Sequence, residues 1–554
     1  TCCFHSFIKS VSPSSNMGST YDRETKVWTG PLKPPILNPE ASFGQTLLAM
    51  LSLNPDRVIQ IDVDTGRSMT CGEMRLRAIR AAQNLTALGL VQGDMVSMAC
   101  ANSENLVPMV LGLLINGMPF NSLSPEFGLD DLAHMMKITQ PKMVFCDVSN
   151  YELTMRAVDL VVKNKPLVYV FECESMNVNK AEDLLKETGR ELMFFPPYLG
   201  DSRKQLGVVI CSSGTTGFPK GVCVSHAQLI SIAGGMFATV KFNYYLNFSY
   251  LFWVSGFYTM IMSLLNCTTR LITRSPFSAD LCFDLLEKFP VDYIFTPPSY
   301  ANILLVHPRL KTVNFSSIKL WAFSGSFLPA KIRDSIAALL PNGRTMNGYG
   351  NTEIGGFATD ITKQKPLSVG TLMANVKAKI VDDNGNDLCN GEQGEVLVKF
   401  SEVFSGYYNN PEASVECVDA EGWFRTGDIA YFDEEGFLFL VDRKKDLLTY
   451  QNYQIAPAEM EALIGKIDGV KDVAVVGLLD EDGVSDLTTA VIVKTSESTL
   501  TKEKVLEIVH GSVANYKKLR GGVHFVSEIP LSSAGKPLRR KVRDNLMQQI
   551  KPPF

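Results

Sequence analysis

The segment Ser212-Ser-Gly-Thr-Thr-Gly-Phe-Pro-Lys-Gly221 lies between two apolar runs, Leu206–Cys211 and Val222–Val224, that are typical of buried strands. Its three glycines let the backbone approach a ligand closely, because no Cβ atoms intervene. Lys220 adds a positive charge, and Gly221 after it excludes a Walker A loop. Hydroxyl donors come from Ser212, Ser213, Thr215 and Thr216. The segment therefore favours polyphosphate binding over the alternative, a flexible surface loop.

Strand-like and helix-like patterns alternate outward from this loop. Short β-branched runs recur at Arg57–Asp62, Met95–Cys100, Pro141–Cys146 and Pro166–Phe171, and Thr70–Leu88 has helical periodicity. Strands that alternate with helices predict a layered α/β protein with mostly parallel sheets. We therefore expect a large N-terminal domain that contains several sheets.

The texture of the chain changes at the five charged residues Asp442–Asp446, which follow the apolar run Phe437–Val441. Beyond them, Pro457 has the position of a helix start, and Asp472–Gly477 and Thr488–Val493 resemble strands. About 110 residues are enough for a small second domain. We predict a large domain over residues 17–441, a hinge linker over 442–446 and a small α+β domain over 447–550.

Composition and charge limit the function classes. The chain has 554 residues, of which 45% are hydrophobic and 20% charged, as in folded soluble proteins. Its formal net charge is only −5, so we expect no nucleic-acid partner. The twelve cysteines form no CxxC pair and the six histidines no HExxH motif, which predicts free thiols in a reducing compartment and no zinc site.

Two long apolar segments could be mistaken for membrane spans. They are Asn105–Pro125 and Phe242–Thr269, and neither contains a charged residue. Proline and glycine interrupt the first, and several asparagines and serines interrupt the second. We interpret both segments as protein core and expect no transmembrane span.

The loop resembles the signature loop of the adenylate-forming superfamily, which includes acyl-CoA synthetases, 4-coumarate:CoA ligases and beetle luciferases. Four further motifs continue the resemblance in the order of the family. They are Asn347-Gly-Tyr-Gly-Asn-Thr-Glu353, Gly422-Trp-Phe-Arg-Thr-Gly-Asp428, Asp442-Arg443 and Gly535-Lys536. The resemblance implies a large multi-sheet domain, a small mobile α+β domain, and ATP, Mg²⁺ and CoA as cofactor or co-substrates.

The resemblance also implies a set of nucleotide-binding residues. Attack of a carboxylate on the α-phosphate of ATP joins two anions, so cations and fixed donors must offset the repulsion. Thr215, Thr216 and Lys220 would contact the β- and γ-phosphates. Thr352 would bond the α-phosphate, and Glu353 would hold Mg²⁺. The wider ATP and AMP set is Ser212, Ser213, Gly214, Thr215, Thr216, Gly217, Gly325, Asn347, Gly348, Tyr349, Asp428, Arg443 and Gln454.

Within this set, three residues would recognise adenosine. Tyr349 would face adenine, Asp428 would accept both ribose hydroxyls, and Arg443 would donate to ribose or phosphate. Taken alone, these residues could also be a core ring, a turn residue and a solvated linker charge.

The resemblance assigns two lysines of the C-terminal region. Lys536 would enter the site from the small domain and contact the substrate carboxylate and the α-phosphate. Lys445, two residues after Arg443, would be the hinge about which the small domain turns. For Lys445, a solvated lysine in a charge run is the alternative.

The resemblance also implies a set of acyl-binding residues, and these are small or apolar, which favours an aliphatic or aromatic acid over an amino acid. They are Trp253, Ser255, Phe257, Ser324, Gly325, Ser326, Gly356 and Phe357. The chain departs from the family pattern at Ser255, where many relatives carry histidine. Phe323 and Phe327 lie where relatives carry a glycine-rich stretch, and we expect them to reshape the acyl pocket.

Two further departures, Thr449 for lysine and Asn452 for glycine, bear on the second half-reaction, because Asn452 adds a side chain where pantetheine would pass. We predict activation of a fatty or aryl acid to an acyl-adenylate and then transfer to CoA. The alternatives are an adenylate-former with another acceptor and a non-catalytic acyl- or nucleotide-binding protein. We expect a cytoplasmic location, since the final residues are not the Ser-Lys-Leu type of many peroxisomal relatives.

Overall fold

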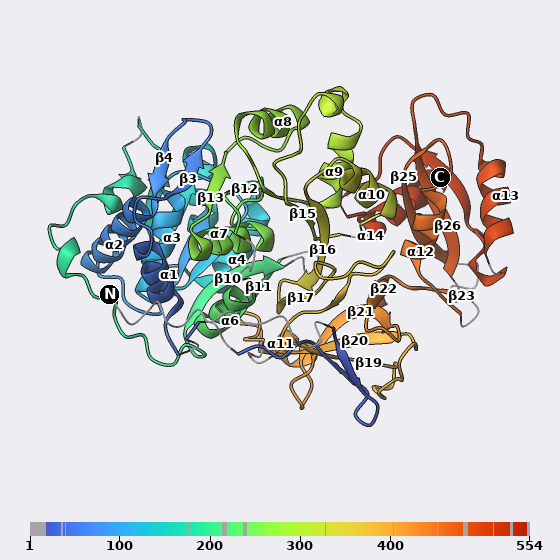
Figure 1. Cartoon of the computed structure of the whole chain (residues 1–554), viewed down its shortest axis with the longest axis horizontal. Helices are drawn as coiled ribbons and strands as arrows, with labels where there is room; N and C mark the ends of the chain where they lie inside the picture. Colours follow the sequence, from blue (N-terminus) through green and yellow to red (C-terminus); the bar gives the residue numbers. More distant parts are fainter. Residues whose placement is uncertain are drawn as a thin grey trace.

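The computed structural model describes residues 18–34, 37–38, 40–174, 177–212, 219–236, 241–326, 328–400, 402, 404–450, 453–479, 486–513, 515–531 and 536–550. Figure 1 shows a large body formed by the N-terminal part of the chain and a smaller C-terminal domain to its right. This arrangement of a large and a small α/β domain confirms the predicted fold class.

One sheet of the large domain carries the glycine-rich loop. In the described residues its spatial order is β11 (Lys220–Ser225), β10 (Leu206–Ser212), β6 (Phe120–Leu123), β5 (Val96–Ala99), β7 (Met143–Asp147), β8 (Leu167–Phe171) and β9 (Asn179–Lys180). All neighbours are parallel except β10 and β11, which form an antiparallel hairpin. The strands predicted around this loop are therefore confirmed.

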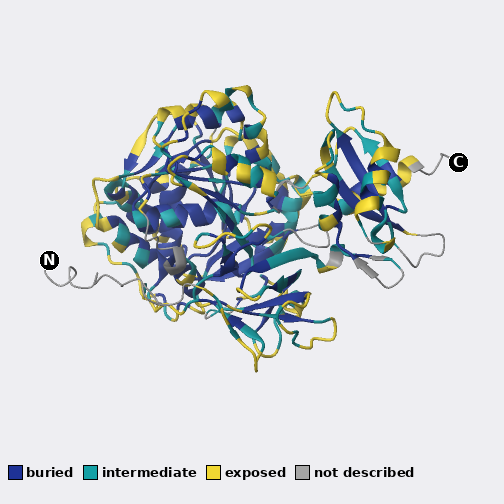
Figure 2. Ribbon diagram, turned by 45° about the vertical axis from the view of Figure 1, so that its right-hand side comes forward, coloured by how far each residue is buried: buried dark blue, intermediate teal, exposed yellow. Residues whose placement is uncertain are grey.

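A second sheet carries the adenine and acyl motifs at the ends of its strands. Its described order is β18 (Thr371–Leu372), β17 (Gly355–Thr359), β16 (Arg344–Asn351), β15 (Leu320–Phe323), β14 (Tyr293–Thr296), β12 (Tyr244–Asn247), β13 (Thr269–Ile272), β3 (Val58–Asp62) and β4 (Ser68–Thr70). The strands from β16 to β3 pair in parallel. Figure 2 shows both sheets as buried ribbons beneath partly exposed helices.

The third sheet of the large domain is antiparallel throughout its described strands, which the prediction of mostly parallel sheets did not anticipate. Its order is β1 (Thr20–Asp22), β2 (Val27–Thr29), β19 (Lys377–Val381), β20 (Gly394–Lys399), β21 (Phe424–Phe432) and β22 (Leu438–Arg443). Burial alternates along β21 because this sheet has one face toward the core and one toward solvent.

Helices cover the sheets of the large domain (Figure 1). They are α1 (Phe43–Ser52), α2 (Cys71–Ala87), α3 (Leu106–Ile115), α4 (Leu129–Thr139), α5 (Tyr151–Val161), α6 (His226–Met236), α7 (Val254–Asn266), α8 (Ala279–Lys288), α9 (Pro298–Leu305), α10 (Ala330–Ala338) and α11 (Pro411–Cys417). The first apolar segment forms α3, which is buried along its length, and β6. The second forms β12, α7 and β13. Among the described residues, no helix combines the length and the apolar character needed to cross a bilayer.

The small domain contains a sheet of β25 (Val470–Leu479), β26 (Asp486–Lys494) and β27 (Gly522–Val526), and a hairpin of β23 (Leu448–Tyr450) and β24 (Tyr453–Ile455). Its helices are α12 (Pro457–Ile464), α13 (Lys502–Ser512) and α14 (Arg539–Ile550). Pro457 begins α12 as predicted. The domain has its own apolar core, in which Ile455, Val475 and Ile492 are buried.

Candidate active site

The hairpin of β10 and β11 places Lys220 opposite Ser212 at its open end. The loop residues Ser213–Gly217, which the sequence assigned to phosphate binding, lie outside the described residues. The ammonium of Lys220 lies 4.9 Å from the centre of the Tyr407 ring. This cation–π contact holds the lysine beside the ring, and no acidic partner of Lys220 is found among the described residues.

Tyr407 also contacts the predicted magnesium-binding carboxylate. Thr352 and Glu353 lie in the turn between β16 and β17, and the Tyr407 hydroxyl donates to Glu353 Oε1 at 2.8 Å. Burial, followed by the charge of Glu353, raises the pKa of Tyr407, so its hydroxyl remains a donor at neutral pH. Tyr407 therefore joins Lys220 to Glu353, a role that the sequence analysis missed.

Tyr349, Asp428 and Arg443 form a second group at the adenosine end. The Tyr349 hydroxyl donates to Asp428 Oδ2 in a short hydrogen bond, and Arg443 Nε lies 2.7 Å from Asp428 Oδ1. The two charged residues are direct neighbours in register on β21 and β22. The Tyr349 ring packs edge-on against Phe357, with ring centres 4.5 Å apart. Three residues assigned to adenine and ribose are thus brought together.

The charges around Asp428 link the two domains. Burial raises the pKa of this carboxyl, whereas Arg443, the Tyr349 hydroxyl and the Lys536 ammonium act in the opposite direction. Lys536 comes from the small domain, just before α14, and its side chain is exposed. The predicted catalytic lysine therefore lies within electrostatic reach of the adenosine group.

The connection between the domains begins inside the third sheet. Asp442 and Arg443 still pair with β21, and Lys444–Asp446 form a short 3₁₀ helix. Asp442 Oδ2 accepts from the Ala458 amide at 2.8 Å, which ties the end of β22 to the start of α12. Lys445 lies in the 3₁₀ helix, whereas Asn452 lies outside the described residues. Thr449 and Gln454 face each other in the backbone register of β23 and β24.

The predicted acyl residues divide into two groups. Trp253 and Ser255 lie at the start of α7, and Ser324, Gly325 and Ser326 follow β15, where Gly325 has a φ of +93°. These residues are exposed or half-buried, and Gly356 on β17 is exposed.

The other predicted acyl residues lie in the core. Phe257 is fully buried and packs against Phe120, with ring centres 6.1 Å apart. Phe357 is also fully buried, beside Tyr349. Phe323 is fully buried among the residues under α8 to α10. Phe327 lies outside the described residues.

Comparison with known proteins identifies the family. The AMP-binding enzyme family model matches residues 51–408, and the model of the AMP-binding enzyme C-terminal domain matches residues 459–536. The chain belongs to the adenylate-forming enzymes. It is 30% identical over 532 residues to probable 4-coumarate–CoA ligase 3 of Dictyostelium discoideum. The matched region covers 92% of this chain and 96% of the relative. This places it in the acyl-CoA ligase branch, to which ATP and CoA are appropriate substrates.

Solved structures share the fold of this adenylate-forming enzyme. ATP-bound MatB from Rhodopseudomonas palustris superposes with a TM-score of 0.82 at 23% identity, over 93% of this chain and 100% of that one. The amide bond synthetase McbA from Marinactinospora thermotolerans superposes with a TM-score of 0.80 at 23% identity, over 91% and 99%. At these identities the likeness concerns the fold.

Magnesium fits the residues around Glu353. One carboxylate oxygen accepts from Tyr407, and the other has no hydrogen bond among the described residues. Within the same part of the chain, no three His, Cys, Asp or Glu side chains gather as a metal cage. Mg²⁺ is commonly held by one or two carboxylates together with nucleotide phosphates, and the single carboxylate of Glu353 is consistent with such coordination.

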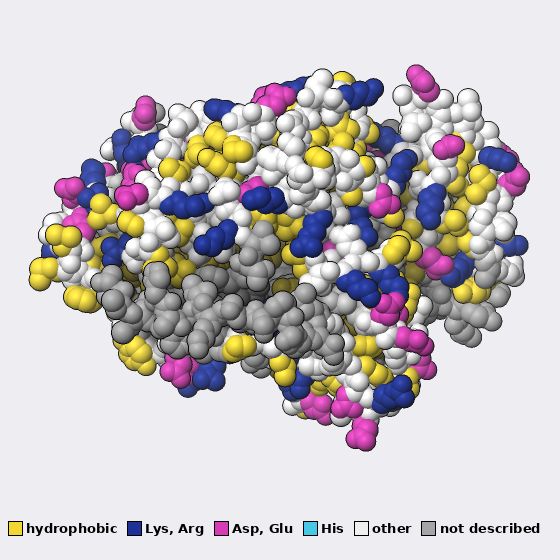
Figure 3. All heavy atoms as spheres, in the orientation of Figure 1, with side chains coloured by type: hydrophobic (Ala, Val, Ile, Leu, Met, Phe, Trp, Pro, Cys, Tyr) yellow, Lys and Arg dark blue, Asp and Glu magenta, His cyan; other side chains and the backbone are white. Residues whose placement is uncertain are grey.

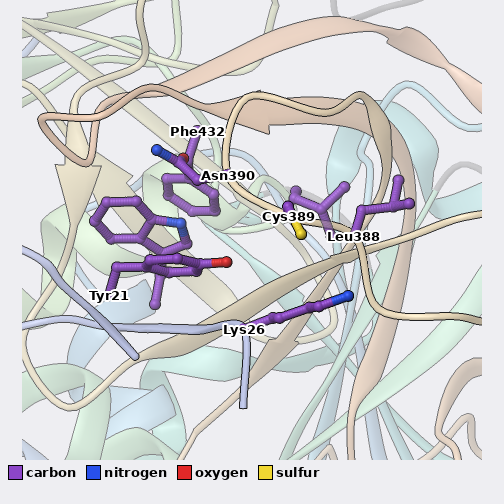
Figure 4. Close-up of a pocket in the computed structure, with 8 residues that line it drawn as sticks. Tyr21, Lys26, Leu388, Cys389, Asn390 and Phe432 are labelled. Atoms are coloured by element: carbon purple, nitrogen blue, oxygen red, sulfur yellow. The ribbon is translucent and has the colours of Figure 1, made fainter. Parts of the chain in front are cut away.

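Two surface hollows of the adenylate-forming enzyme lie away from these residues. The hollow in Figure 4 lies at the antiparallel sheet and is lined by Tyr21, Lys26, Leu388 and neighbouring residues. The Lys26 ammonium there donates to the Asp387 carbonyl at 2.7 Å. The other hollow, of about 360 Å³, lies around Leu88 and Lys142. Neither hollow contains a predicted site residue. The candidate active site is therefore defined by the contacts among its side chains and not by either hollow.

Proposed function

We propose that the enzyme activates a fatty or aryl carboxylic acid with ATP, forming an acyl-adenylate and pyrophosphate, and that CoA then displaces AMP to give the thioester. The observation that carries the proposal is the hydrogen-bonded group of Tyr349, Asp428 and Arg443. The charge of Lys536, from the small domain, also acts to lower the pKa of the Asp428 carboxyl. Arg443 of the large domain thus bonds this carboxylate, and the charge of Lys536 from the small domain acts on the same group.

Each end of this group has a task in the first half-reaction. Asp428, held by Tyr349 and Arg443, would accept the ribose hydroxyls and fix the nucleotide. Lys220 would contact the β- and γ-phosphates, and Thr352 the α-phosphate. Bound at Glu353, Mg²⁺ would neutralise phosphate charge. Lys536 would then offset the negative charge that builds up when the acid oxygen attacks the α-phosphate.

The acyl side supports an apolar acid. The half-buried positions at the start of α7 are Trp253 and Ser255, and the Ser255 hydroxyl already donates to Ser249 Oγ at 2.9 Å. None of the predicted acyl residues is charged. A substrate amino group would therefore lack a counter-charge, whereas an aliphatic or aromatic body would be accommodated.

Exchange of labelled pyrophosphate into ATP, measured over a panel of fatty, aryl and amino acids, tests the first half-reaction. We expect exchange with at least one fatty or aryl acid and none with amino acids. Exchange with amino acids alone would overturn the assigned substrate class. Absence of exchange with every acid, together with retained AMP binding, would instead favour the non-catalytic binding protein.

The second candidate is an adenylate-former whose acceptor is not CoA. It is favoured by Asn452 and Thr449, which depart from the pattern of CoA-using relatives. One structural neighbour is an amide bond synthetase. AMP release with and without CoA separates the two candidates. A CoA ligase releases AMP in step with thioester, whereas the alternative predicts no acceleration by CoA and acceleration by an amine.

A further inference from the structure

A short segment between β9 and β10 presents large apolar side chains to solvent. In residues 191–198, Leu192, Met193, Phe195 and Tyr198 have exposed fractions between 80% and 103%. Figure 3 shows hydrophobic side chains gathered at the left-hand end of the molecule, where Figure 1 places the loops of this part of the chain. Single exposed apolar residues are ordinary on protein surfaces, but four in seven positions are not.

The backbone of this segment is fastened to the body by side-chain amides. Gln83 on α2 donates to the Arg190 carbonyl at 3.0 Å, and Gln45 on α1 donates to the Pro197 carbonyl at 3.3 Å. Gln92 donates to the Leu199 carbonyl at 2.8 Å, and the Leu199 side chain is buried. These bonds fix both ends of the segment. The outward direction of the apolar side chains is therefore set by the fold.

The acidic side chains around the segment are paired with cations, whereas two of its flanking cations have no acidic partner among the described residues. Its acids are paired with cations of the protein: Glu187 and Glu191 with Arg80, and Asp201 with Arg203. Arg190 and Lys204, which flank the apolar residues, are exposed and have no acidic partner in the described part of the chain. The tip thus combines protruding apolar side chains with two cations whose charge is available to an anionic surface.

The size and shape of the patch select among partners. Four such side chains expose on the order of 600 Å² together. A stable dimer buries about 800 Å² on each partner, usually between flat and complementary surfaces. A small protruding tip that carries aromatic rings beside cations instead fits the interface of a lipid bilayer, where aromatic residues lie at headgroup depth.

We propose that the segment 191–198 is a docking tip for anionic membrane surfaces, with Leu192, Met193, Phe195 and Tyr198 inserted among the lipids. Arg190 and Lys204 contact acidic headgroups. The enzyme would then lie on the surface of the bilayer without spanning it. This partner is independent of the proposed reaction, because no residue of the tip belongs to the candidate active site.

Co-sedimentation of the full chain with vesicles tests this proposal. We expect binding to vesicles of phosphatidylcholine with phosphatidylserine, and weaker binding to phosphatidylcholine alone. The double variant Leu192→Ser/Phe195→Ser should lose at least about tenfold in partitioning, because two large apolar side chains no longer insert. Val306→Ser is the matched control, since Val306 is 78% exposed on another surface.

A charge variant separates the two contributions. Arg190→Gln/Lys204→Gln should reduce binding to the anionic vesicles and leave binding to phosphatidylcholine unchanged. Pyrophosphate–ATP exchange without vesicles should be the same for all variants. Equal vesicle binding by the wild type and the Leu192→Ser/Phe195→Ser variant would overturn the proposal. So would light scattering that shows a dimer which this variant abolishes, because the tip would then bind a second copy.

Discussion

At the predicted adenosine end of the candidate site, Tyr349 and Arg443 each bond to Asp428, so contacts within the protein hold the three side chains together. At the predicted acyl end, the Ser255 hydroxyl donates to Ser249 Oγ, and Phe257 lies in the core. Under the proposed function, nucleotide recognition would therefore rest on a few polar side chains that the protein already holds in place. Acid recognition would rest instead on the shape that apolar packing gives to the acyl pocket.

Lys536→Ala is the strongest way to break the adenosine end. We expect a loss of about 1,000-fold in pyrophosphate–ATP exchange, because a preorganised cation that stabilises transition-state charge is removed. Affinity for ATP should change little. The matched control is Lys541→Ala, another exposed lysine of the small domain. Exchange at the wild-type rate in the Lys536 variant would refute the catalytic assignment.

The buried His226 should make the stability of the folded protein depend on pH. It begins α6 directly after β11, is fully buried, and its Nδ1 accepts from the Phe43 amide at 3.0 Å. Burial lowers the pKa of His226 to about 4. The unfolded chain takes up a proton below about pH 6.5, whereas the folded ring stays neutral until about pH 4.

Unfolding stability should therefore be full above about pH 6.5 and fall by about 3 kcal/mol as the pH drops to 4. Urea unfolding at a series of pH values measures this decline. His226→Asn should show a flatter pH dependence, because the group that titrates is gone. His307→Asn, on another helix end, is the control, and an equally steep decline in both variants would contradict the assignment.

Tyr407→Phe tests the contact between the loop lysine and Glu353. We expect KM for MgATP to rise about tenfold, because the carboxylate loses the hydrogen bond that orients it. KM for the acid should stay unchanged. Tyr408→Phe is the control, since no hydrogen bond of its hydroxyl exists among the described residues. A loss confined to thermal stability would mean that Tyr407 is only a packing residue.

Ser255→Ala sharpens the acyl end and should have the smallest effect. Its hydroxyl bonds to Ser249 rather than to a charged group, so we expect a change of a few-fold in KM for the acid. KM for MgATP serves as the internal control. An equal change in both constants would show that the start of α7 is not specific to the acid.

Much of the fold could be predicted, because segments rich in β-branched residues that alternate with amphipathic segments indicate parallel strands and the helices that connect them. The start of α12 at Pro457 followed from the missing amide hydrogen of proline. The antiparallel third sheet could not be predicted in the same way. It combines β1 and β2 with strands more than 300 residues later, and pairing at such a distance leaves no local pattern.

In the candidate site, too, residues within local motifs could be predicted, whereas contacts between distant segments could not. Tyr349, Asp428 and Arg443 stand in recognisable motifs, and the structure brings them together. Tyr407 carries no such signal, because it contacts Glu353 across 54 residues of sequence. Phe257 was assigned to the acyl site from the resemblance to the family, and its burial against Phe120 depends on packing that the motif does not encode.

The last residue of β22 is Arg443, which bonds Asp428, and the short connection to the small domain starts at the next position. A torque applied to the connection would therefore reach the Arg443 guanidinium with no intervening residue. In the proposed function, occupancy of the ribose subsite would thereby be coupled mechanically to the angle between the domains, and loss of the nucleotide would change the resistance to rotation.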